Sequence, residues 1–97
     1  MLTRWTKEAA DDLEGLLAYT EQHSLLAATH VARHISQTIQ NIALFPNAAR
    51  FDRETGTNEA VVRGLPLLII YNAKKSFIEI IAVFHTARDP KNKRRHS

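Results

Sequence analysis

Histidine, arginine and tyrosine are the side chains on which any catalysis by this protein would have to depend, because the 97-residue sequence contains no cysteine. Two of its five histidines, His30 and His34, stand four positions apart, a spacing that places both rings on one face of a helix and suits metal ligation. No third ligand type and no acidic residue accompanies them. We therefore expect no metal site and no cofactor.

Asp11 and Asp12 are adjacent carboxylates that could suggest a pair for acid–base catalysis. Neighbouring residues on a helix point in different directions, however, so the two carboxylates would not meet over one substrate. Negative charge is also favourable in the first turns of a helix. We therefore interpret both residues as solvated charges near a helix start.

Positive charge exceeds negative charge by 13 to 10, but four of the 13 positive residues lie in residues 91–97. The first helical region is acidic, so a phosphate-binding or target-binding surface is expected on the C-terminal half and the tail. A solubilising, disordered end is the alternative explanation for the tail. The candidate cations are Arg50, Arg53, Arg63, Arg88, Lys93, Arg94 and Arg95.

The length allows one domain, which we assign to residues 1–90, followed by a basic tail over residues 91–97. The longest apolar run, Phe77 to Phe84, is interrupted by Glu79 and is too short to cross a bilayer. Residues 1–5 lack the apolar segment of a secretory signal. The expected location is the cytoplasm.

Two amphipathic helices should follow a short β-favouring segment, Leu2 to Trp5. Thr6 is a suitable N-cap for the first helix, whose apolar positions recur at helical spacing. The stretch from Glu21 to Ser24 predicts a break, and Ser24 is a suitable second N-cap. The second helix should end near Leu44, and the two together should form an antiparallel hairpin.

Three runs rich in apolar and β-branched residues predict a meander of antiparallel strands over Glu59–Arg63, Leu67–Asn72 and Phe77–Phe84. The polar segment between Asn47 and Asn58 is expected to be a loop. The third run is almost continuously apolar, which predicts an interior strand. The order is thus β-α-α-β-β-β, an α+β fold in which the helical hairpin packs on an antiparallel sheet.

Several short motifs in this order resemble the RelE/ParE superfamily, the toxins of type II toxin–antitoxin systems. The resemblance extends from Leu2 to about Pro90. It is carried by Trp5-Thr6-x-x-Ala9-x-x-Asp12-Leu13, Leu44-Phe45-Pro46 followed by Arg50, Gly56-Thr57-Asn58-Glu59-Ala60-Val61-Val62, Leu67-Leu68-Ile69-Ile70-Tyr71 and Ile78 to Asp89, which includes Phe84-His85-Thr86-Ala87-Arg88.

The resemblance implies a small bacterial toxin that arrests growth and is neutralised by a cognate antitoxin. One scaffold serves two mechanisms in this superfamily. ParE-like members inhibit DNA gyrase without being nucleases. RelE-like members are metal-independent endoribonucleases that cleave messenger RNA on the ribosome, and there Arg63 would bind phosphate while His85 would serve acid–base catalysis.

The residues favour the ParE-like branch. A His-x-x-Arg-Asp ending, here from His85 to Asp89, is frequent in ParE-like members without a nuclease role. Residues 47–63 contain no lysine, whereas the RelE nucleases resembled carry lysines there. Tyr71 belongs to the general Ile-Ile-Tyr strand pattern, so we interpret it as structural, and Trp5 as a core or sheet-capping aromatic. Whether the protein is an enzyme stays open at this point.

A DNA-binding or purely structural module is disfavoured, since no basic helix or helix-turn-helix spacing occurs. For the expected antitoxin, we predict an extended or helical segment that lies along an apolar groove between the helical hairpin and the sheet. Its acidic residues should meet the basic C-terminal half. The expected assembly is a hetero-oligomer with the antitoxin.

Overall fold

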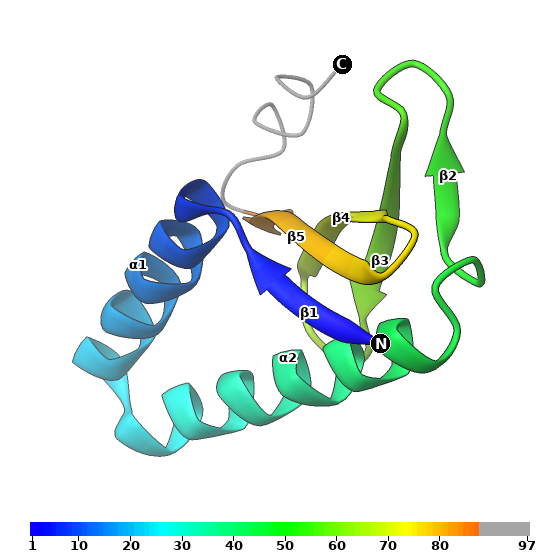
Figure 1. Ribbon diagram of the computed structural model, residues 1–97. Helices are drawn as coiled ribbons and strands as arrows, with labels where there is room; N and C mark the ends of the chain where they lie inside the picture. Colours follow the sequence, from blue (N-terminus) through cyan, green and yellow to red (C-terminus); the bar gives the residue numbers. More distant parts are fainter. Residues whose placement is uncertain (88–97) are drawn as a thin grey trace.

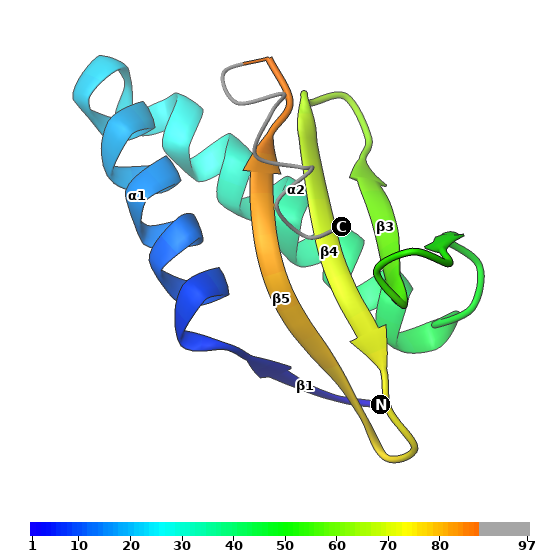
Figure 2. The same cartoon turned by 90° about the horizontal axis from the view of Figure 1, so that it is seen from above.

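A five-stranded sheet with two helices on one face is the architecture of the computed structural model, which describes residues 1–87 (Figures 1 and 2). The predicted α+β class is confirmed, and so is the helical hairpin on the sheet. The elements follow the order β1 (Leu2–Trp5), α1 (Lys7–His23), α2 (Leu25–Leu44), β2 (Arg50–Asp52), β3 (Thr57–Val62), β4 (Leu67–Ala73) and β5 (Phe77–His85).

Both predicted N-caps begin their helices. The Thr6 hydroxyl accepts a hydrogen bond from the Ala9 N–H, and the Ser24 hydroxyl accepts one from the Ala27 N–H, each at 3.1 Å. The predicted break was too wide, because the helix continues through His23 and Ser24 alone joins α1 to α2. Ser24 has extended backbone angles, so the chain turns there without a longer loop.

The strand order is β1-β5-β4-β3-β2, which leaves β1 and β2 at the two edges. The pairs β3/β4 and β4/β5 are antiparallel, as predicted, and β2/β3 is antiparallel as well, but β1 pairs with β5 in parallel, with Trp5 opposite Ile80. The sheet is therefore mixed. Its interior strand β5 is the apolar run that the sequence predicted to be central.

One strand lies within the segment that was expected to be a loop. Strand β2 comprises Arg50–Asp52 and pairs with β3, with Phe51 opposite Asn58. A three-residue strand with charged ends carries no recognisable period-two pattern, so its sequence gave no signal. The hairpin closes through a turn in which the Gly56 N–H donates to the Asp52 carbonyl at 2.8 Å, and Gly56 has a φ of 71°.

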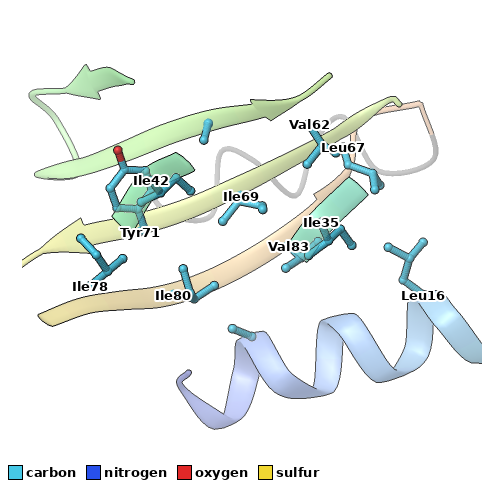
Figure 3. Packing of buried hydrophobic residues seen from close by; sticks show 12 residues of the cluster. Leu16, Ile35, Ile42, Val62, Leu67, Ile69, Tyr71, Ile78, Ile80 and Val83 are labelled. Carbon is cyan, nitrogen blue, oxygen red and sulfur yellow. The ribbon is translucent and has the colours of Figure 1, made fainter. Parts of the chain in front are cut away.

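The core lies between the helices and the sheet. Figure 3 shows Ile69, Tyr71 and Ile80 of the sheet on the side of Ile35 and Ile42 from α2. A smaller buried cluster occupies the opposite face of the sheet and consists of Leu68, Ile70, Ala82 and Phe84. Within residues 1–87, neither helix is both long and apolar enough to span a membrane.

A β-bulge interrupts β5 between Ile80 and Ala82. Ile70 pairs with Ala82 and Tyr71 pairs with Ile80, so Ile81 is an extra residue on β5. The bulge changes the alternation of the strand. Ile78 and Ile80 point to the helices before the bulge, and Val83 does so after it.

Candidate functional site

Arg63 and His85, the two residues proposed for catalysis by resemblance, lie at the same end of the sheet. Val62, Leu67 and His85 form one cross-strand row, and Arg63 follows Val62 directly. The turn after Arg63 is held against the end of β5, because the Thr86 N–H and hydroxyl both donate to the Pro66 carbonyl at 2.8 and 3.1 Å. Arg63 itself is exposed and lies just beyond β3, which ends at Val62 rather than at the predicted Arg63.

The register places the His85 side chain on the helix-covered side of the sheet. His85 is directly opposite Leu67, whose side chain belongs to the core beneath the helices. Residues that face each other across a strand pair project to the same side, so the half-buried imidazole shares that side with Leu67 and Val83. The ring is therefore positioned at the rim of the core rather than on the open face.

The remaining candidate cations do not converge with Arg63. Arg50 is exposed on edge strand β2, opposite Glu59. Arg53 is exposed in the turn before β3. That turn and Arg63 lie at opposite ends of β3, which at about 3.4 Å per residue separates them by about 17 Å or more. Arg88, Lys93, Arg94 and Arg95 lie outside the described residues.

Tyr71 is a structural residue, as the sequence predicted. Its side chain is fully buried, and its hydroxyl donates a 2.7 Å hydrogen bond to the Pro46 carbonyl. Burial raises the pKa of the Tyr71 phenol above its ordinary value. The neutral phenol thus fastens the segment after α2 to the centre of β4, and its donor is not directed to solvent.

The histidine pair on α2 offers little for a metal. The His30 and His34 rings are 4.1 Å apart, and Nδ1 of His34 lies 2.9 Å from the His30 carbonyl oxygen. One ring nitrogen is therefore engaged by the backbone of its own helix. Within residues 1–87, no three histidine or carboxylate side chains gather to a metal-binding group.

An apolar groove opens between the two helices and β1. Its volume is about 280 Å³. Trp5 lines it from β1, and the exposed Ala32 and Gln40 line it from α2. The complete lining is Thr3, Trp5, Leu13, Leu17, Ala32, Ile35, Ser36, Ile39 and Gln40.

The groove adjoins a sheet edge that is open within residues 1–87, where β1 pairs only with β5. Figure 1 shows α1, α2 and β1 surrounding this region. Trp5 is half-buried and packs against the core, which agrees with its interpretation as a core or sheet-capping aromatic. A recess with apolar walls beside unpaired backbone groups suits a peptide segment from another protein.

Polar contacts between α1 and the β5 bulge fix one wall of this groove. The Thr6 hydroxyl donates to the Ile81 carbonyl at 3.1 Å while it caps the helix. Two turns later, the Asp12 carboxylate accepts a 3.0 Å hydrogen bond from the Val83 N–H. Between them Ala9 is fully buried, which allows the helix to approach the sheet closely.

The interpretation of Asp12 as a solvated charge is therefore wrong. Asp12 is half-buried, whereas its neighbour Asp11 is exposed and pairs with Lys7 at 3.0 Å. The bulge at Ile81 was not foreseen, and a single sequence does not show which backbone N–H it leaves for a side chain. The helical spacing of Thr6, Ala9 and Asp12 was the available signal, since all three lie on one face.

Comparisons with known proteins agree on one family. Residues 3–90 match the family model described as ParE toxin of type II toxin-antitoxin system, parDE. The chain is 32% identical over 82 residues to "Putative toxin Y4kP" of Sinorhizobium fredii, covering 84% of each protein. It is 30% identical over 84 residues to toxin RelE2 of Caulobacter vibrioides, covering 87% of this chain and 93% of that protein.

A solved structure shares the fold. It is described as the chromosomal ParDE TA system from P. aeruginosa, with a TM-score of 0.71 and 20% identity. The match covers 86% of this chain and 92% of that chain.

Proposed function

Because this chain belongs to the ParE toxin family of type II toxin–antitoxin systems, we propose that it arrests bacterial growth by binding and inhibiting DNA gyrase in the cytoplasm. It is a toxin of a type II system, and an antitoxin is its partner. Gyrase inhibition is the mechanism that ParE-like members of the superfamily use. It requires a binding surface and no catalytic residues.

The position of His85 is the observation that supports this mechanism best. A nuclease needs its base and its phosphate-binding cation to face the same reacting atoms. His85 projects toward the helix-covered side, opposite Leu67, while exposed Arg63 follows β3 two strands away. At about 4.8 Å per strand, their backbones are about 10 Å apart. A structural role for His85 at the end of β5 accounts for this arrangement.

The apolar groove is the site that we assign to the antitoxin. An antitoxin segment with apolar residues would bury Trp5, Leu17 and Ile39, and its backbone could pair with the open edge of β1. Acidic residues of that segment would meet the basic C-terminal half. Burial of this groove should also stabilise a domain with a small core.

The alternative is a RelE-like endoribonuclease that cleaves messenger RNA on the ribosome. The observation that favours it is the common location of Arg63 and His85 at one end of the sheet, where Thr86 holds the turn at Pro66. In this mechanism Arg63 would stabilise charge on the phosphate and His85 would transfer a proton.

Induced expression in cells separates the two mechanisms. Gyrase inhibition should raise a DNA-damage reporter and cause filamentation before any loss of messenger RNA. Primer extension on translated messages should show no new cleavage sites at early times. New cleavage at codons, before any damage response, would reject the gyrase mechanism and support the nuclease.

A His85→Ala variant tests the same choice at one residue. We expect it to remain fully toxic, because no proton transfer is required for gyrase binding. His30→Ala, an exposed histidine on α2, serves as the matched control. Loss of toxicity in His85→Ala at an unchanged melting temperature would instead support the nuclease mechanism.

A further inference from the structure

Strand β2 is the outer strand at the second edge of the sheet, far from the groove at β1. Phe51, at its centre, is 55% exposed. Two further apolar side chains at the end of α2, Leu44 and Phe45, are 70% and 66% exposed. Figure 1 shows the end of α2 and β2 at the same side of the molecule. Short edge strands commonly carry charge to discourage association, and β2 does so at both ends, but it also exposes a phenylalanine between its two opposite charges.

The backbone of Phe51 faces the open edge. The Asp52 carbonyl accepts from the Gly56 N–H, so the backbone polar groups of Asp52 point back toward the β3 side of the hairpin. In an antiparallel ladder, successive residues direct these groups to opposite sides of the strand. The N–H and C=O of Phe51 therefore point away from β3, where no strand of the described chain pairs with them.

The sequence of β2, Arg50-Phe51-Asp52, is complementary to itself when it is read in the opposite direction. We propose that the protein forms a homodimer in which two β2 strands pair antiparallel about a two-fold axis at Phe51. Arg50 then lies opposite Asp52 of the partner subunit, and the reciprocal pair forms by symmetry. Phe51 exchanges two backbone hydrogen bonds with Phe51 of the partner subunit.

The charges surrounding Arg50 agree with this pairing. On its own chain Arg50 is opposite Glu59, which is 9% exposed. In the dimer it would lie between Glu59 and the carboxylate of Asp52 of the partner subunit. Asp52 uses Oδ1 to accept from the Glu54 N–H at 2.9 Å, and a carboxylate has further acceptor capacity for a guanidinium group.

The apolar residues contribute on the other side of the strand. Phe51 is opposite Asn58, and alternation along β3 places Asn58 on the side of Ala60 and Val62, which face the helices. Leu44 and Phe45 end the helix on that side, and the bond from Tyr71 to Pro46 holds the segment that follows them. Pairing would bring together Phe51 side chains from both subunits, beside these exposed residues.

The dimer leaves the antitoxin groove accessible. The groove is lined by β1 and the helices, and β1 and β2 are opposite edges of the sheet. Two toxin subunits joined at β2 could therefore each bind an antitoxin segment. The proposal does not depend on whether gyrase or the ribosome is the target.

Charge reversal with rescue tests the pairing. Arg50→Asp alone and Asp52→Arg alone each place like charges opposite each other twice in the dimer, whereas the double variant restores complementary pairs. Because three residues form a small interface, we expect a dissociation constant of roughly 10 µM to 1 mM for the natural chain. Sedimentation of the purified full chain over this concentration range measures it.

Each single reversal should raise the dimer dissociation constant by about tenfold or more, and the double variant should recover most of that loss. Arg53→Asp, an exposed arginine just outside β2, should change it little and controls for net charge. Melting temperatures show that each variant folds. A monomer at the highest concentration, or a dimer unaffected by both single reversals, would overturn the proposal.

Discussion

The Asp12 carboxylate accepts a 3.0 Å hydrogen bond from the backbone N–H of Val83, a residue 71 positions further along the chain. This contact joins the second turn of α1 to the strand beside the bulge at Ile81. Strand β1 ends at Trp5, opposite Ile80, so it does not extend beside Val83. The Asp12 side chain takes the place of a neighbouring strand there by accepting from the Val83 N–H. The helix is thus part of the hydrogen-bonding system of the sheet.

Asp12→Ala should lower the free energy of unfolding by about 1–3 kcal/mol, because the N–H of buried Val83 then loses its partner. Asp11→Ala is the matched control. Its carboxylate is exposed and pairs only with an exposed lysine, so its loss should cost about 0.5 kcal/mol or less. Urea denaturation measures both, and equal effects would contradict the assignment.

Thr6→Ala should cost more than Ser24→Ala, although both hydroxyls cap a helix. Ser24 makes one capping bond, for which about 1 kcal/mol is typical. The Thr6 hydroxyl also donates to the Ile81 carbonyl, so about 2 kcal/mol is expected there. Thr6→Ser, which keeps both bonds, should recover most of the loss. Thermal unfolding followed by circular dichroism makes this comparison.

Tyr71→Phe should lower stability by about 1 kcal/mol near neutral pH through loss of the bond to Pro46. The difference from the natural chain should shrink as the pH rises above 10.0, the ordinary pKa of the phenol. Above that pH the phenol of the unfolded chain releases its proton, whereas folded Tyr71 retains it because burial raises the pKa of Tyr71. The natural chain therefore loses folding stability as the pH increases. Urea denaturation of both proteins from pH 7 to pH 11 checks this. A constant difference would contradict it.

Ala32→Glu should weaken antitoxin binding by about a hundredfold, because it places a charge in the apolar groove at a position that is exposed in the free chain. Ala18→Glu, an exposed position on α1 outside the groove lining, is the matched control. Titration calorimetry with the protein encoded by the adjacent gene measures both affinities. Unchanged binding of Ala32→Glu at an unchanged melting temperature would exclude the groove as the antitoxin site.

The sequence predicts those parts of the fold that depend on local signals. Thr6 and Ser24 begin helices because their hydroxyls satisfy free N–H groups, and such caps are recognisable in a sequence. The nearly continuous apolar run of β5 is also a local signal, and it correctly predicted an interior strand. The parallel pairing of Trp5 with Ile80 and the three-residue β2 depend on contacts between distant segments, which no periodicity records.

In the candidate site, too, local sequence patterns are informative and contacts between distant segments are not. The Ile-Ile-Tyr strand pattern correctly predicted that Tyr71 is structural. The side on which His85 projects depends on the bulge at Ile81, which reverses the alternation of the last strand. The prediction that Asp12 is solvated is wrong because the N–H of Val83, two residues after the bulge, is available to its carboxylate. The side on which His85 lies and the hydrogen bond of Asp12 thus both depend on the bulge at Ile81, which the sequence does not reveal.

The pairing of β1 with β5 also determines when the apolar groove can form during synthesis of the chain. Thr6 and Ile81 are 75 positions apart, so β1 has no strand to pair with until β5 has been made. Thr3 and Trp5, which line the groove, cannot take their places before then. A nascent chain would thus lack the groove that we assign to the antitoxin until β5 has been synthesised.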